Sequence, residues 1–160
     1  MSMGFGGGLL AVNSEVDIEH STIGHNNEDG IRVTEGALRG DHLTVAENTL
    51  IGVSGPAEIR ASILVENGTS CSSDVMSVSN FFNSVVQSPC YTTGDVFDTT
   101  NALLPFEDSS WPLGTGYFPL NPAQPLTHDV SVDNCTIDQL GFARGTPCDP
   151  GAVERLIALE

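Results

Sequence analysis

The chain has 160 residues and is strongly acidic, with 21 Asp and Glu side chains against five basic ones, all of them Arg. A formal net charge of −16 repels phosphate backbones and anionic lipid headgroups, so we expect no binding to nucleic acid or to membrane surfaces. No run of 18 apolar residues is present, so we also expect no membrane insertion. Charged residues make up only 16% of the chain, while Gly, Ser, Thr and Asn are plentiful, which favours short strands and tight turns over long helices.

The first segment, residues 1–12, is Gly-rich, and we interpret it as a tail outside the repeated part of the chain. It lacks the basic region and the long apolar region of a secretory signal peptide. Because other features below indicate export, we expect these residues to be preceded by the rest of a longer β-helix upstream. Residues 9–18 would then present an exposed strand edge.

Residues 13–70 contain a repeat. The segments 16–26, 38–48 and 57–67 align without gaps, and their final Asn residues lie 22 and then 19 positions apart. One coil of a parallel β-helix has this length and stacks on the next coil at about 4.8 Å. We therefore predict an all-β fold, a right-handed parallel β-helix (solenoid), whose coils occupy residues 13–70.

The aligned segments alternate between apolar and polar residues, which separates an inner face from an outer face. The predicted inward columns are Val16–Leu38–Ala57, Ile18–Gly40–Ile59, Ser21–Leu43–Ser62 and Ile23–Val45–Leu64. The predicted outward columns are Asp17–Arg39–Glu58 and Glu19–Asp41–Arg60. We name these six outward residues the charged face, and they are the candidate ligand-binding residues. Opposite charges mostly face one another between successive coils, as stacking requires.

The Asn residues that end the three segments predict an asparagine ladder. Asn26, Asn48 and Asn67 would each hydrogen-bond the amide of the next coil, so we interpret them as structural rather than functional.

Two His residues occupy the same turn position in successive segments. We expect His20 and His42 to stack about 5 Å apart in an exposed turn. A metal site is disfavoured because the third segment has Ala61 at this position, and a tetrahedral site needs three or four ligands.

Residues 71–160 lose the clean repeat, and we predict the last coils followed by an irregular C-terminal cap. A partial coil is expected within 75–86 and a further strand–turn–strand rung within 130–137. The apolar, Pro-rich segment 101–127, which includes Trp111, should fold along the last coils and shield the open end of the solenoid. A short helix is expected at 152–160.

The four Cys residues permit three disulfide pairings and lack the close spacing of a zinc site. We favour Cys71–Cys90 and Cys135–Cys148, because each pair closes a loop with little hydrophobic content. Each bond would contribute about 3 kcal/mol of stability. Disulfides indicate an oxidising compartment, and reduction should loosen residues 71–148 before the first coils.

Several stretches resemble the right-handed β-helix proteins that carry a choice-of-anchor Q domain, a family common among exported bacterial proteins. The stretches are 61–71, 88–90, 101–105 and above all 138–154, which reads DQLGFARGTPCDPGAVE. This resembles the family's Asp-Gln-x-Gly-x-x-Arg and Cys-Asp-x-Gly-Ala-x-Glu ending, with Pro150 where the family usually has Ile. The resemblance covers about residues 13–154 and implies a secreted or cell-surface bacterial protein, without a settled activity.

The sequence contains no phosphate-binding loop, no G-x-S-x-G elbow and no H-E-x-x-H motif. We therefore predict a non-catalytic, structural or adhesive segment that stabilises or terminates a longer solenoid. We expect weak contacts with a polysaccharide or cell-surface glycan, or with Ca²⁺, and no other cofactor. The alternative is part of a carbohydrate-active enzyme, a polysaccharide lyase or glycoside hydrolase. In that case the carboxylates of the charged face would hold Ca²⁺ or act as acid and base, with Arg60 as base or substrate clamp. Trp111, Tyr117 and Tyr91 lie in the irregular half, where we expect Trp111 to pack in the cap rather than against sugar.

Overall fold

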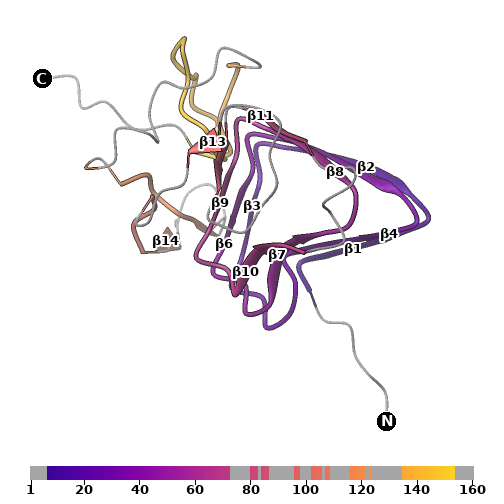
Figure 1. Cartoon of the computed structure of the whole chain (residues 1–160). Helices are drawn as coiled ribbons and strands as arrows, with labels where there is room; N and C mark the ends of the chain where they lie inside the picture. Colours follow the sequence, from indigo (N-terminus) through magenta and orange to yellow (C-terminus); the bar gives the residue numbers. More distant parts are fainter. Residues whose placement is uncertain are drawn as a thin grey trace, which may run out of the picture.

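The chain folds as a parallel β-solenoid with a triangular cross-section (Figure 1). The computed structural model describes residues 7–72, 80–82, 84–86, 96–97, 102–105, 107–108, 116–121, 123 and 135–153. Within these residues all regular secondary structure is β, and each coil gives one strand to each of three parallel sheets. The predicted fold class is confirmed.

The three sheets form the sides of the triangle, and every strand pairs with its equivalent in the next coil. The first sheet contains β1 (Leu9–Val12), β4 (Ile31–Thr34), β7 (Ile51–Ser54) and β10 (Thr69–Cys71). The second contains β2 (Glu15–Glu19), β5 (Ala37–Asp41), β8 (Ala57–Arg60) and β11 (Asn80–Phe82). The third contains β3 (Thr22–Gly24), β6 (Thr44–Ala46), β9 (Ile63–Val65), β12 (Ser84–Val86) and β13 (Val96–Phe97). Outside the solenoid, β14 (Glu107–Asp108) pairs antiparallel with β15 (Gly116–Tyr117).

The register of the second and third sheets matches the alignment of the repeat. Leu38 pairs with both Val16 and Ala57, and Val45 pairs with both Ile23 and Leu64. A fourth coil continues in register through β11 and β12, as expected for the partial coil within 75–86. The predicted tail at 1–12 is wrong at its C-terminal end, because β1 pairs with β4 and belongs to the first coil.

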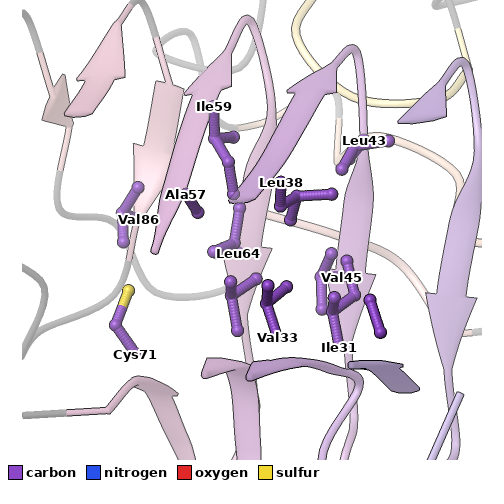
Figure 2. Close-up of a cluster of buried hydrophobic side chains, with 12 residues drawn as sticks. Ile31, Val33, Leu38, Leu43, Val45, Ala57, Ile59, Leu64, Cys71 and Val86 are labelled. Carbon is purple, nitrogen blue, oxygen red and sulfur yellow. The ribbon is translucent and has the colours of Figure 1, made fainter. Parts of the chain in front are cut away.

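The core fills the interior of the triangle, where side chains from all three sheets meet (Figure 2). Leu38 and Ile59 come from the second sheet, and Val45 and Leu64 from the third; all four are essentially inaccessible to solvent. The first sheet completes this core with Ile31, Val33 and Val53, which lie between the aligned segments of the repeat.

Each corner of the triangle turns on a single residue with a left-handed backbone. The non-glycine residues at these corners have φ between 45° and 57°, a conformation that costs L-amino acids energy outside Gly, Asn and Asp. One corner stacks His20, His42 and Ala61, and another stacks His25, Glu47 and Glu66. The coils therefore repeat their turns as strictly as their strands.

A second layer covers the outer face of the third sheet. Outward residues Ala46, Ile63, Val65 and Val85 pack against residues of the irregular segment, namely Ala102, Leu103, Phe118 and Leu120. The segment lies along the coils as expected, but its described residues cover the outer face of the third sheet and not the open end of the solenoid. The reason is that the outward positions of this sheet are apolar, so both faces of the parallel sheet need cover. Trp111 lies outside the described residues.

Residues 135–153, which we name the clasp, fold back against the corner between the second and third sheets. The Gly151 amide donates to the Ala61 carbonyl at 2.7 Å, and the Ala152 amide donates to Thr44 Oγ1 at 2.9 Å. The rung expected within 130–137 is wrong for its described part, because Ile137 forms an antiparallel bridge with Ala143 instead of joining the stack. The helix expected at 152–160 is wrong at its start, since residues 152–153 are irregular, and residues 154–160 lie outside the described part.

Candidate functional site

The charged face lines a shallow groove on the outer side of the second sheet. The groove has a volume of about 380 Å³. The structure brings all six predicted residues together around it, and Ile18 and Gly40 complete its lining. The residues are Asp17, Glu19, Arg39, Asp41, Glu58 and Arg60.

The strand register fixes the charge pattern of this groove. In one column Arg39 lies between Asp17 and Glu58, so opposite charges alternate along the stack. Arg60 also reaches along its own strand, with Nη2 2.8 Å and Nε 3.1 Å from Glu58 Oε1. Both side chains are about half exposed, so this ion pair stabilises the fold by only about 0–1 kcal/mol. The side chains of Glu58 and Arg60 therefore lie close together while both remain accessible to a polar ligand.

The other column places two carboxylates, Glu19 and Asp41, in directly paired positions. Like charges in such positions repel. Asp41 Oδ1 lies 2.9 Å from His42 Nδ1, which gives this carboxylate a hydrogen-bond donor on the side of the corner. Among the residues that the structure describes, no three His, Cys, Asp or Glu side chains gather closely enough to hold a metal ion. The groove thus presents carboxylates and guanidinium groups, which can accept and donate hydrogen bonds.

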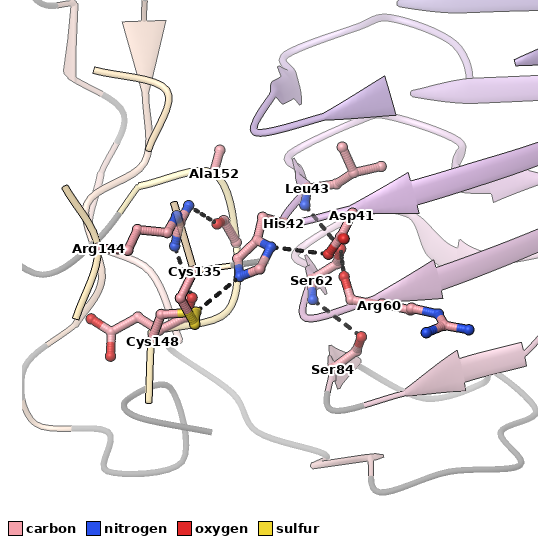
Figure 3. Close-up of polar contacts among 12 residues, drawn as sticks. Asp41, His42, Leu43, Arg60, Ser62, Ser84, Cys135, Arg144, Cys148 and Ala152 are labelled. Atoms are coloured by element: carbon pink, nitrogen blue, oxygen red, sulfur yellow. Dashed lines mark hydrogen bonds and ion pairs between the residues drawn. A yellow bond between two sulfur atoms is a disulfide. The ribbon is translucent and has the colours of Figure 1, made fainter. Parts of the chain in front are cut away.

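The His20–His42 pair stacks as predicted, with ring centroids 5.2 Å apart and an angle of 28° between the rings. The expectation of an exposed turn is wrong, because His42 is fully buried and His20 is half-buried. The clasp covers this corner, which explains the burial (Figure 3). Burial lowers the pKa of His20, and the positive charges of Arg144 and His42 lower it further against the opposing effect of Glu19 and Asp41.

The predicted disulfide between Cys135 and Cys148 is confirmed, and it closes the clasp. Cys148 is fully buried, and its Sγ lies 3.2 Å from Nε2 of His42 (Figure 3). Asp41, His42 and Cys148 thus form a continuous series of polar contacts. Sequence reasoning missed this arrangement, because Cys148 follows His42 by 106 residues and only the folded clasp brings them together. The other predicted pair includes Cys90, which lies outside the described residues, so that pairing stays a prediction.

The asparagine ladder is present and structural. Asn26 Nδ2 donates to Asn48 Oδ1 at 2.7 Å, and Asn48 Nδ2 donates to Asn67 Oδ1 at 2.8 Å. The same acceptor oxygens also receive the backbone amides of Asn26 and Asn48. Asn67 Nδ2 ends the described ladder on the carbonyls of Val45 and Val65.

The C-terminal motif residues hold the clasp in shape. Arg144 is buried and donates to the carbonyls of Asp149 at 2.9 Å and Gly151 at 2.7 Å. Asp138 Oδ1 accepts the amides of Leu140 and Phe142, which closes a tight turn. Both side chains thus form hydrogen bonds with backbone groups of the clasp, which indicates that the motif stabilises the fold of the clasp.

No family model, curated protein or solved structure matches this chain. The resemblance to the choice-of-anchor Q proteins therefore stays a prediction. In the part of the chain that the structure describes, no helix has the length and apolarity needed to cross a membrane. The Cys135–Cys148 disulfide is consistent with an oxidising, extracellular location.

Proposed function

We propose that the chain is a non-catalytic, structural or adhesive segment of a secreted or cell-surface bacterial protein, and that its charged face contacts a glycan. The observation that carries this proposal is the groove on the second sheet, in which carboxylates and guanidinium groups repeat from coil to coil. The disulfide-closed clasp and the resemblance to the choice-of-anchor Q family support an extracellular setting.

The chemistry of the groove suits an extended polyol. The carboxylates of Asp17 and Glu19 accept hydrogen bonds, and the guanidinium of Arg39 donates them. The same face can therefore accept a hydrogen bond from a sugar hydroxyl and donate one to it. Successive strands lie about 4.8 Å apart, so these groups recur at regular intervals along the stack. A chain of sugar units can therefore contact carboxylates and guanidinium groups on several successive coils.

The charge balance favours an uncharged glycan. Four carboxylates and two guanidinium groups line the groove, and the whole chain carries a net charge of −16. A polyanionic polysaccharide would be repelled at long range. We therefore propose a neutral polysaccharide as the ligand class and expect weak binding, since the described residues that line this groove include no aromatic ring to stack on sugar.

The test compares two substitutions of the same type on one strand. Glu19 lines the groove, whereas Glu15 is also exposed on β2 but does not line it. We expect Glu19→Gln to weaken binding to a neutral polysaccharide by about three- to tenfold, because a charge-assisted hydrogen bond is replaced by a neutral one. Glu15→Gln should leave the affinity unchanged. Isothermal titration against a panel of neutral and acidic polysaccharides measures both.

The same panel of polysaccharides distinguishes a non-catalytic binding segment from a carbohydrate-active enzyme. Release of reducing ends or of unsaturated products during the titration would identify a carbohydrate-active enzyme. Equal binding by the two variants, or no binding to any neutral polysaccharide, would contradict the proposal.

A further inference from the structure

The fully buried pair formed by His42 and Cys148 is not used by the proposed glycan site. His42 Nδ1 lies 2.9 Å from Asp41 Oδ1, and His42 Nε2 lies 3.2 Å from Cys148 Sγ. In a carboxylate–imidazole–sulfur series, the carboxylate orients the ring and stabilises its cationic form, and the imidazolium stabilises a thiolate. Here the sulfur is engaged in a disulfide with Cys135.

We propose that the Cys135–Cys148 disulfide is a redox-reactive site, at which external thiols attack Cys135 and the Asp41–His42 pair receives Cys148 as the leaving thiolate. The co-reactants are small dithiols or thiol-bearing peptides. His42 contacts a reacting atom and is the catalytic residue of the exchange, while Asp41 is a positioning residue. This inference does not rest on glycan binding, although Asp41 belongs to both sites.

The exposure of the two sulfur-bearing residues gives the exchange a direction. Cys135 is half-buried, whereas Cys148 is fully buried. An approaching thiolate therefore attacks Sγ of Cys135, which forms a mixed disulfide there and breaks the bond to Cys148. The electron pair of the broken bond moves to Sγ of Cys148, beside His42 Nε2. Attack of a second thiolate on the mixed disulfide then releases Cys135 and oxidises the two external thiols to a disulfide, a two-electron reduction overall.

The rate of this exchange depends on how well Cys148 leaves. A leaving thiol with a lower pKa departs faster, and an adjacent imidazolium lowers the pKa of a thiol. The imidazole of His42 faces the Asp41 carboxylate on its own coil, the His20 ring on the coil before and the Cys148 sulfur on the clasp. Arg144 and Glu19 act on the neighbouring His20 and also belong to this environment. Loss of the His42 side chain should therefore slow the departure of Cys148.

The experiment measures reduction of the intact chain by dithiothreitol at neutral pH, with alkylation and mass spectrometry of each Cys. We expect His42→Asn to slow reduction of Cys135–Cys148 by about tenfold. Asn tolerates the left-handed backbone that His42 adopts, with φ at 51°. His25→Asn is the matched control, because His25 has a φ of 57° at another corner and should leave the rate unchanged.

Asp41→Asn provides a second, independent variant. It keeps the shape of the side chain but removes the negative charge that orients the imidazole, so the rate should fall several-fold. If His42→Asn does not fold, as judged by circular dichroism, this variant decides the question.

Trapping with glutathione at limiting concentration tests the direction of attack. The mixed disulfide should form on Cys135 rather than on Cys148. Equal reduction rates in wild type and both variants, or glutathione on Cys148, would each overturn the proposal.

Discussion

Asn48 occupies the middle of the asparagine ladder and is 1% exposed. Its side-chain oxygen accepts the amides of Asn26, and its nitrogen donates to Asn67. We expect Asn48→Ala to reduce the free energy of unfolding by about 2–3 kcal/mol, because partners on both sides lose a buried hydrogen bond. Urea unfolding measures this loss. Asn27→Ala, at an exposed neighbouring position, should change stability by less than about 0.5 kcal/mol, and equal losses in the two variants would contradict a structural ladder.

His20 gives the fold a defined dependence on pH. Its pKa in the folded chain is lowered from 6.5, chiefly by burial and then by Arg144 and His42. The unfolded chain therefore binds this proton more tightly, so the stabilisation is complete above pH 6.5 and is lost as the pH falls below it. We expect His20→Asn to lose less stability than wild type between pH 7.5 and pH 5.5. Urea unfolding at both pH values measures the difference, and equal losses would show that His20 does not contribute.

At the scale of the strand, sequence periodicity predicted the second and third sheets because apolar residues alternate within the aligned segments. It gave the pairing of Asp17 with Arg39 and of Ile23 with Val45 without any structural information. The first sheet was missed as a repeat, since its strands lie between the aligned segments. The segment 101–127 was expected over the open end and not on the third sheet, where a Cβ atom at Gly24 would lie 2.7 Å from the Phe118 ring.

Phe118 tests whether the outer layer stabilises the solenoid. It is 1% exposed and belongs to the buried cluster that includes Ile63 and Val65. We expect Phe118→Ala to lower the free energy of unfolding by about 3–5 kcal/mol, the usual cost of such a cavity. Phe142→Ala is the matched control, since Phe142 is 48% exposed in the clasp. Chemical denaturation measures both, and a small effect at Phe118 would mean that the coils are stable without their cover.

At the scale of the whole molecule, contacts between the coils and the clasp lay beyond sequence reasoning. Thr22 and Gln139 are hydrogen-bonded across 117 residues, and no periodic pattern connects them. The charged face was predictable because its positions repeat from coil to coil, although the residue types differ. The burial of His42 was not, because it depends on a non-repeating segment that returns to the first coils. Contacts that repeat between coils could thus be inferred from the spacing of residues in the sequence. The contacts between the clasp and the coils occur once, so they could be identified only in the folded structure.

Trypsin offers a direct test of how the clasp is held, because the chain contains five Arg and no Lys. Arg32, Arg39 and Arg60 lie in paired strands, whereas Arg144 lies in the irregular clasp and is 7% exposed. With the Cys135–Cys148 bond intact, we expect slow cleavage after Arg144. Reduction should make Arg144 the first of these four Arg residues to be followed by a cut, since the loop that buries it is then no longer closed.

Limited digestion with mass spectrometry gives the order of cleavage. Under oxidising conditions a cut after Arg144 leaves its two products joined by the Cys135–Cys148 disulfide, so it appears only as the added mass of one water. Cys135→Ser should reproduce the reduced pattern without any reductant, because it removes this bond alone. An unchanged order of cleavage in both the reduced chain and this variant would show that hydrogen bonds from residues such as Gln139 and Ala152, rather than the disulfide, keep the clasp on the coils.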